Sequence, residues 1–390
     1  MYLRRGLFAA RAAGDSPSKT ASRGCVRRTP NRRLTGEAGL RGKARLAEMS
    51  HEQMKAMVAG FGAQLRWAAD LDPVPMRPSG QVIVAGMGGS GISGDFAAAL
   101  ADVPIILNKS YGLPKWVQNS QPLIVAMSYS GNTEETLSAA ESAVNQGLTP
   151  AVVTGGGTLG TWAAEQGWPT VTVPGGLQPR AALGYLLGGL LHLLNGAGAT
   201  SVARGDLMSA ADMVDSITGD GGSGWPLASD LAEGLTGRIV VVYGGGGITS
   251  PVAQRWKTQI NENAKWPAWH SSLPELDHNE IVSWTSLADL TRARVGIVSL
   301  RDCDEAPGVT ARFRHTAEIT GRDVAWVGEV WSQGDSVLAR MLSLAAMGDL
   351  VSLELARSEG VDPVPVDAIE NLKRKLAEKE PVPMNTKDAS

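Results

Sequence analysis

The chain has 390 residues, of which 43% are apolar, so it can bury a sizeable core and by its length can form two to three globular domains. Of its 36 basic and 39 acidic residues, 12 basic and 3 acidic ones lie in residues 1–48, which leaves a net charge of −12 on the rest of the chain. With this acidic balance, residues 49–390 lack the basic face that nucleic-acid binding needs. No apolar run reaches the ~18 residues of a membrane span.

The N-terminal segment, residues 1–48, is rich in Arg and Ser and poor in acidic residues. We expect a disordered basic tail there, although the same composition is typical of an organellar transit peptide, and translation could instead start at Met49. It contains no apolar h-region of a secretory signal. Its Cys25 and the distant Cys303 give no disulfide framework, which favours a reducing cytoplasm. Five scattered histidines without ligand spacing argue against a bound metal.

The first half of the folded body alternates helices and strands. Apolar residues at helical spacing from Met54 to Ala68 predict an amphipathic helix. Apolar runs predict strands at 81–85, 103–107, 122–127, 150–153 and 170–173, with helices between most of them, for example at 133–146 and 180–194. Because these strands are apolar almost throughout, we expect a parallel sheet with both faces covered.

The pattern then restarts after a boundary within residues 196–236. A strand at 238–243 runs into the glycines 244–247 and a helix from about Thr249, and strands near 294–299 and 323–328 precede a helix at 335–357. A basic helix near 366–378 follows. The sequence therefore predicts an α/β protein of two similar doubly wound parallel-sheet domains with flanking helices.

A glycine loop, residues 86–91, follows the first predicted strand. Its G-x-G-x-x-G spacing matches a dinucleotide-binding fingerprint, but the next strand ends in Asn108-Lys109 rather than in the acid that holds the ribose hydroxyls. The glycines could also serve only a tight turn. A third interpretation is a monophosphate cradle, in which main-chain N–H groups and Ser90 face an anion at a helix N-terminus.

A second loop also follows a buried strand and opens a helix. Its residues Ser128, Ser130 and Thr133 offer three hydroxyls within six positions. Hydroxyls and free helix amides suit the oxygens of a phosphomonoester, although Ser and Thr at helix starts often act only as caps. The chain contains no P-loop motif that would indicate nucleoside triphosphate hydrolysis.

Both loops, residues 86–95 and 128–136, resemble the sugar-phosphate-binding loops of sugar isomerase (SIS) domains. Residues 179–185, 261–265, 278–281 and 362–373 resemble, in order, motifs of the bifunctional phosphoglucose/phosphomannose isomerases. The resemblance spans roughly residues 50–380. It implies SIS domains at 49–205 and 225–358, and a C-terminal helix and tail at 359–390.

The resemblance also implies roles for individual residues. Glu262 would be the catalytic base, His278 would assist ring opening, and Arg180 and Lys373 would hold charge near the sugar. The expected phosphate-binding residues are Gly88, Gly89, Ser90, Ser128, Ser130 and Thr133. A carboxylate tuned toward the working pH can move a proton between C1 and C2, and a permanent cation can face the resulting enediolate.

On this basis we expect an isomerase without metal or cofactor. It would interconvert fructose 6-phosphate with glucose 6-phosphate and mannose 6-phosphate through a cis-enediol, in cytoplasmic glycolysis and gluconeogenesis. Its partners would be small-molecule sugar phosphates and a second copy of the chain, in a homodimer whose active site both subunits share. Val364 stands where many relatives have Thr, which bears on the substrate range.

Two other functions fit the same loops. A non-catalytic sugar-phosphate-binding SIS regulatory protein would keep the hydroxyls but would not need Glu262 or His278. An SIS isomerase could also act on another sugar phosphate, such as an amino sugar or a pentose.

Overall fold

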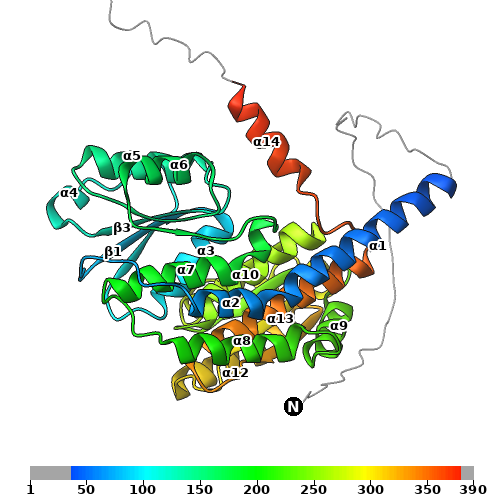
Figure 1. Ribbon diagram of the computed structural model, residues 1–390. Helices are drawn as coiled ribbons and strands as arrows, with labels where there is room; N and C mark the ends of the chain where they lie inside the picture. Colours follow the sequence, from blue (N-terminus) through cyan, green and yellow to red (C-terminus); the bar gives the residue numbers. More distant parts are fainter. Residues whose placement is uncertain (1–36, 379–390) are drawn as a thin grey trace, which may run out of the picture. The chain divides into compact units, whose positions relative to one another are not determined.

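Two parallel β-sheets organise residues 37–378, the part of the chain that this computed structural model describes (Figure 1). The first has the strand order β2-β1-β3-β4-β5 and the second β7-β6-β8-β9. The strands of the first sheet are β1 (Val82–Gly86), β2 (Ile105–Asn108), β3 (Leu123–Ser128), β4 (Ala151–Thr154) and β5 (Thr170–Thr172). Those of the second are β6 (Ile239–Gly244), β7 (Ala268–Ser272), β8 (Val295–Arg301) and β9 (Trp326–Trp331). All strand pairs are parallel, which confirms the predicted duplicated architecture.

Helices cover both faces of the first sheet, as its apolar strands predicted. One face packs against α5 (Glu134–Asn145) and α6 (Gly157–Gln166) through Ala140, Leu159 and Ala163. The other face packs against α3 (Gly88–Ala98) and α7 (Leu183–Gly196), and α4 (Val117–Ser120) is a single turn before β3. The helix expected at 180–194 is divided, because Pro179–Ala181 forms a separate 3₁₀ turn, η1, before α7.

Two helices precede the first sheet where one was expected. α1 (Glu37–Ala59) and α2 (Phe61–Ala69) are separated at Gly60, which has φ −75° and ψ 0°. Of the expected tail, residues 1–36 lie outside the described residues, and residues 37–48 belong to helix α1. The residues from Gly42 onward form one unit, and the description below concerns this unit.

The second sheet is built in the same way. Its helices and turns are α8 (Arg204–Thr218), α9 (Gly224–Leu235), α10 (Thr249–Gln259), the π-helical turn η2 (Ile260–Ala264), the 3₁₀ turns η3 (Glu275–His278) and η4 (Glu280–Thr285), α11 (Ala288–Arg294), α12 (Pro307–Thr320), α13 (Val337–Ser358) and α14 (Asp367–Ala377). Strand β7 was not predicted, because this edge strand exposes Trp269 and His270 and so has no apolar run. Strand β9 starts at Trp326, three residues after the predicted position.

One hydrophobic core joins the two halves. Helix α13 is buried from Leu338 to Ala356 and packs against α8, α9 and α10. The same core includes Leu186 beneath the first sheet and Val240 in the second. The halves predicted as separate SIS domains therefore pack as one body, which allows a site to draw residues from both. Within the described residues, no helix combines the length and apolar character needed to span a bilayer.

Candidate active site

The two hydroxyl-bearing loops meet at the edge of the first sheet. Strands β1 and β3 are neighbours, with Gly86 paired to Met127, and their following helices, α3 and α5, lie on opposite faces of the sheet. Such a reversal of strand order opens a crevice at the carboxyl ends of the strands, where ligands of doubly wound proteins bind. The free N–H groups at the starts of both helices point toward this crevice, which suits an anion.

The predicted hydroxyl residues lie together in this crevice. The Oγ of Ser128 is 2.9 Å from Oγ1 of Thr133 and 3.5 Å from Oγ of Ser130. Ser90, from the first loop, accepts a hydrogen bond from the main-chain N–H of Tyr129 at 3.3 Å. The structure thus brings hydroxyl groups of both loops close together.

Two positions of the first loop, Gly88 and Gly89, require glycine for different structural reasons. Gly88 has φ +51°, a left-handed conformation that glycine adopts without steric penalty. Gly89 instead allows a close approach, because a Cβ there would lie 2.9 Å from the carbonyl oxygen of Pro179. The start of α3 therefore rests directly on the turn that carries Arg180.

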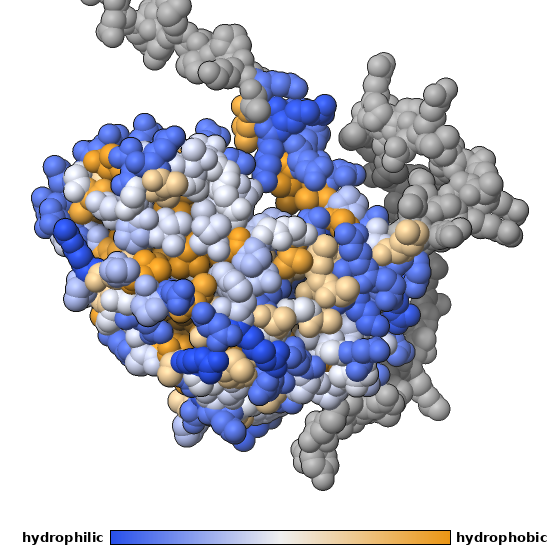
Figure 2. All heavy atoms as spheres, in the orientation of Figure 1, coloured by the Kyte–Doolittle hydropathy of each residue, from blue (hydrophilic) through white to orange (hydrophobic). Residues whose placement is uncertain are grey.

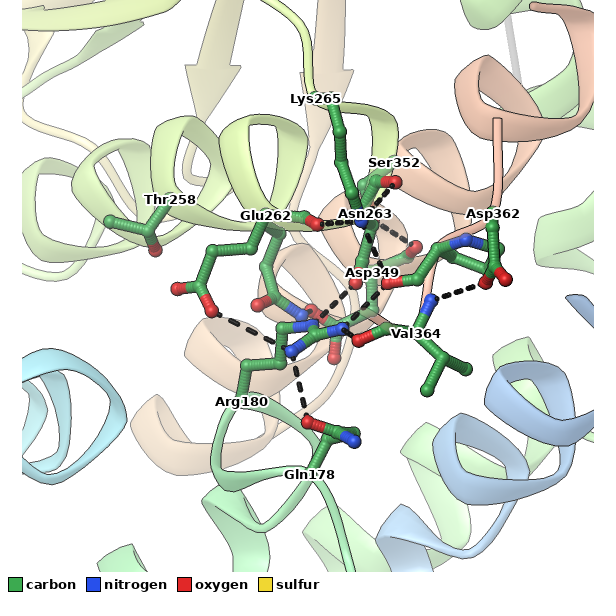
Figure 3. A network of polar contacts seen from close by, with 12 residues as sticks. Gln178, Arg180, Thr258, Glu262, Asn263, Lys265, Asp349, Ser352, Asp362 and Val364 are labelled. Carbon is green, nitrogen blue, oxygen red and sulfur yellow. Dashed lines mark hydrogen bonds and ion pairs between the residues drawn. The ribbon is translucent and has the colours of Figure 1, made fainter. Parts of the chain in front are cut away.

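Arg180 is the centre of a buried polar network (Figure 3). Its Nε donates to Oδ1 of Asn263 at 2.6 Å, and its Nη2 donates to the carbonyl oxygens of Pro363 and Val364 at 2.6 and 2.9 Å. Its Nη1 donates to Gln178 at 3.3 Å. Burial lowers the pKa of Arg180, and Glu262 offsets part of this change. The guanidinium is thus fixed on two edges, while the Nη1 edge faces Glu262.

Glu262 lies on the π-helical turn that ends α10. Its Oε2 is 3.7 Å from Nη1 of Arg180, and its side chain is 28% exposed, whereas that of Arg180 is 3% exposed. Turns of this kind inside helices often occur at functional sites, because the extra residue redirects a side chain. The arrangement gives a carboxylate with solvent access beside a fixed cation.

Lys265 follows this turn and connects it to the C-terminal segment. Its main chain is left-handed, with φ +56°, and its Nζ donates to the carbonyl oxygens of Glu262 at 2.6 Å and Pro363 at 3.1 Å. Burial, followed by the charge of Arg180, lowers the pKa of Lys265 to about 8. Lys265 and Arg180 together hold the segment Asp362–Val364, which we call the strap, against the site.

Comparison with known proteins identifies the family of this chain. The family model of the bacterial phospho-glucose isomerase C-terminal SIS domain matches residues 226–376. The bifunctional phosphoglucose/phosphomannose isomerase of Caldicellulosiruptor bescii is 38% identical over 306 residues, which cover 76% of this chain and 90% of that protein. The chain belongs to this isomerase family. The family member of Aquifex aeolicus is 36% identical over 83% of this chain and 98% of its own length.

The fold of this family member is also found among solved structures. A hypothetical protein of Thermus thermophilus superposes with a TM-score of 0.63 at 15% identity, covering 88% of this chain and 97% of the other. At that identity the likeness concerns the fold alone. It agrees with the duplicated SIS architecture described above.

Two residues expected in the site have no hydrogen bond or ion pair to Arg180 or Glu262 in the described part of the chain. His278 ends η3 with its side chain exposed, and Lys373 is exposed on α14. The surface of α14 carries apolar as well as charged residues (Figure 2), and its exposed apolar side chains are Ile369, Leu372 and Leu376.

The sequence did not single out several residues that organise the site. Beneath Arg180, Arg255 donates to Asp349 at 2.7 Å, and both side chains are almost fully buried. Burial raises the pKa of Asp349, while Arg255 and Gln259 oppose this change. One available signal was a charged residue, Asp349, within the apolar middle of a long helix.

Proposed function

We propose that this chain interconverts fructose 6-phosphate with glucose 6-phosphate and mannose 6-phosphate, without a metal ion or cofactor in the reaction. The observation that carries the proposal is the pairing of the Glu262 carboxylate with the buried Arg180 guanidinium at 3.7 Å. Arg180 is adjacent to the phosphate loops through the contact between Gly89 and Pro179. A base, a cation and an anion cradle are thus grouped as an aldose–ketose isomerase needs them.

In this proposal the phosphate binds between the two loops of the first sheet. The main-chain N–H groups of Gly88, Gly89 and Ser90, and the hydroxyls of Ser128, Ser130 and Thr133, would donate to its oxygens. The phosphate would hold the sugar chain so that C1 and C2 lie over Glu262. Most of the binding energy would then come from the end of the substrate that does not react, and the orientation of C1 and C2 would follow from it.

Glu262 then moves the proton. Its carboxylate removes the proton from C1 of fructose 6-phosphate, and the C1–C2 double bond forms as the carbonyl electrons move to O2. In the cis-enediolate the hydroxyl proton passes from O1 to the neighbouring O2. The carboxylic acid then returns its proton to C2 while the electrons on O1 form the C1 carbonyl of the aldose. Arg180, through Nη1, stabilises the negative charge that develops on the oxygens of the enediolate. Because C2 is planar in this intermediate, protonation of one face gives glucose 6-phosphate and protonation of the other gives mannose 6-phosphate.

His278 and Lys373 complete the proposal. We assign ring opening to His278 of a partner subunit in a homodimer, and a charge near the sugar to Lys373. Support for the dimer comes from the exposed apolar side chains of Val282, Leu287 and Leu290, which follow His278 in the sequence. The proposed enzyme acts in the cytoplasm, in glycolysis and gluconeogenesis.

The deciding experiment supplies the purified full-length chain with fructose 6-phosphate in the presence of EDTA and measures both aldose products separately. We expect both products from the wild type and neither from Glu262→Gln, which keeps the shape of the side chain but cannot accept the proton. Glu233→Gln, an exposed change on α9, is the matched control and should behave like the wild type. Binding of the sugar phosphate without turnover would support a regulatory protein instead, and turnover only of an amino-sugar or pentose phosphate would redirect the substrate assignment.

The shared site is tested by mixing two inactive variants, Glu262→Gln and His278→Ala, under conditions that exchange subunits. If His278 acts in the partner's site, each mixed dimer contains one intact site, and random exchange restores about a quarter of the wild-type activity. If His278 acts in its own chain, mixing restores nothing. Sedimentation of the wild type gives the oligomeric state directly.

A further inference from the structure

Helix α13 supports Arg180 through residues of α10 and the π-helical turn η2. It carries Asp349 and Ser352, which are spaced by three residues and so lie on the same face of the helix. Both are buried, with exposed fractions of 2% and 0%. Neither touches the crevice, but each begins a chain of hydrogen bonds that ends at Arg180 (Figure 3).

The first chain fixes the main chain of Arg180. The carboxylate of Asp349 accepts from Nη2 of Arg255 at 2.8 and 2.7 Å, and from Nε2 of Gln259 at 2.7 Å. The same Nη2 of Arg255 donates to the carbonyl oxygen of Arg180 at 3.1 Å. A buried ion pair therefore anchors the turn η1, on which the N-terminus of α3 also rests.

The second chain fixes the guanidinium. Ser352 donates from Oγ to the carbonyl oxygen of Asp349 at 2.7 Å, so its Oγ is left as an acceptor for Nδ2 of Asn263, at 2.9 Å. The Oδ1 of Asn263 then points at Nε of Arg180, at 2.6 Å. Nε of arginine cannot accept a hydrogen bond, so Oδ1 of Asn263 must face Arg180 and Nδ2 must face Ser352. Arg180 and Ser352 thus hold the Asn263 amide from its two ends.

We propose that Ser352 and Asp349 are positioning residues for the reaction, which hold the Nη1 edge of Arg180 toward the substrate oxygens beside Glu262. The inference rests on the isomerase function proposed above. Without the Ser352 hydroxyl, Nδ2 of Asn263 loses its acceptor, so the amide is held only by its hydrogen bond from Nε of Arg180 and can move together with the guanidinium. The guanidinium then loses the fixed orientation that charge stabilisation in the enediolate requires.

The test is Ser352→Ala, a small deletion that leaves the charges of Arg255 and Asp349 paired. We expect kcat for fructose 6-phosphate to fall about tenfold, because Arg180 acts on charge that exists only during the reaction, while KM stays within about twofold. The matched control is Ser343→Ala on the same helix. Ser343 is also buried, donates to the carbonyl oxygen of Arg340 at 2.7 Å and accepts from the N–H of Gln333 at 2.8 Å, but does not contact the Arg180 network. It should lose similar stability and keep its kcat.

A second measurement separates positioning from a general loss of structure. We compare binding of 5-phosphoarabinonate, whose carboxylate stands in for the enediolate, with binding of glucitol 6-phosphate, which is a neutral polyol at the reacting end. Ser352→Ala should weaken the first about tenfold and leave the second within about twofold. Equal changes for both ligands, or a kcat equal to that of Ser343→Ala, would refute the positioning role alone. A wild-type chain that binds neither ligand and turns over no hexose 6-phosphate would refute the proposed function, and this inference with it.

Discussion

Gly89 lies against the main chain of Pro179, so the proposed phosphate-binding loop and the turn that carries Arg180 should move together. The substitution Gly89→Ala perturbs this contact. The added Cβ would lie 2.9 Å from the carbonyl oxygen and 3.4 Å from the carbonyl carbon of Pro179. Both atoms are main chain, so no flexible side chain can move aside. To reach ordinary contact at about 3.4 Å, the start of α3 and the turn η1 must separate by about 0.5 Å.

This separation should affect catalysis more than stability. Overpacking of this kind costs about 1–3 kcal/mol, and the higher helix propensity of alanine returns up to about 1 kcal/mol, so we expect a net loss near 1 kcal/mol. A displacement of 1 Å at reacting groups can lower rates about 100-fold, so half that distance should lower kcat/KM for fructose 6-phosphate about tenfold.

The assay combines steady-state turnover of fructose 6-phosphate with urea unfolding. Gly205→Ala in α8 is the control, because a Cβ there meets nothing within 4 Å; it should gain a little stability and keep wild-type kinetics. If Gly89→Ala turns over substrate within twofold of the wild type, the loop and Arg180 do not depend on each other, and the reasoning fails.

Two further predictions concern pH. The pKa of Lys265 is lowered from its ordinary 10.5 to about 8, so between these pH values the unfolded chain binds more protons than the folded one. The free energy of unfolding of the wild type should therefore rise with pH relative to that of Lys265→Met. If urea unfolding at pH 7.5 and 9.5 gives the same difference in free energy between the two proteins, this prediction is contradicted. Burial lowers the pKa of His51 below 6.5, against the opposing charge of Glu354, and among the residues that the structure describes its Nδ1 has no hydrogen-bond partner. The stability that neutral His51 provides is present above pH 6.5 and lost below it. The melting temperature should therefore drop more between pH 7 and pH 5 in the wild type than in His51→Gln. An equal drop in both proteins would contradict the assignment.

The fold could be predicted because its strands are buried on both faces. Apolar runs marked eight of the nine strands, and the exception, β7, is an edge strand whose Trp269 is 56% exposed. The hydroxyl residues could be named from the sequence, because they follow buried strands at helix starts. That β1 and β3 are neighbours, which brings the two loops to the same edge of the sheet, is seen only in the structure.

The support of Arg180 could not be predicted in this way. The π-helical turn at Glu262 depends on contacts of Lys265 with the strap, about 100 residues further along the chain. Asn263, Asp349 and Ser352 come together only when α10 packs against α13. Local propensity carries no information about such pairs, although a buried aspartate in an apolar helix indicates that a partner must exist.

The second half keeps the topology of the first but has different chemistry at its own strand ends. The glycines 244–247 follow β6 as residues 86–91 follow β1, yet β8 ends in Arg301 and Asp302 rather than in hydroxyl residues. Arg301 is paired with Glu305 and, at 2.8 Å, with Glu329, while Asp302 accepts from Arg340 at 2.9 Å. Carboxylates at this edge would repel a phosphate, and the arginines that could bind it are already paired.

Because of this difference, the two halves contribute different residues to the candidate site. In the proposed mechanism the first half supplies the phosphate-binding loops and Arg180, and the second supplies Glu262, Asn263 and the supporting face of α13. Neither half contains the whole arrangement, so the distance from phosphate to base depends on the packing between them. A continuous core, with α13 buried along most of its length, fixes that distance more firmly than a linker between two domains could. In the proposed mechanism the strand ends of the first half therefore bind the substrate, while those of the second half carry paired charges and stabilise the body that holds Glu262.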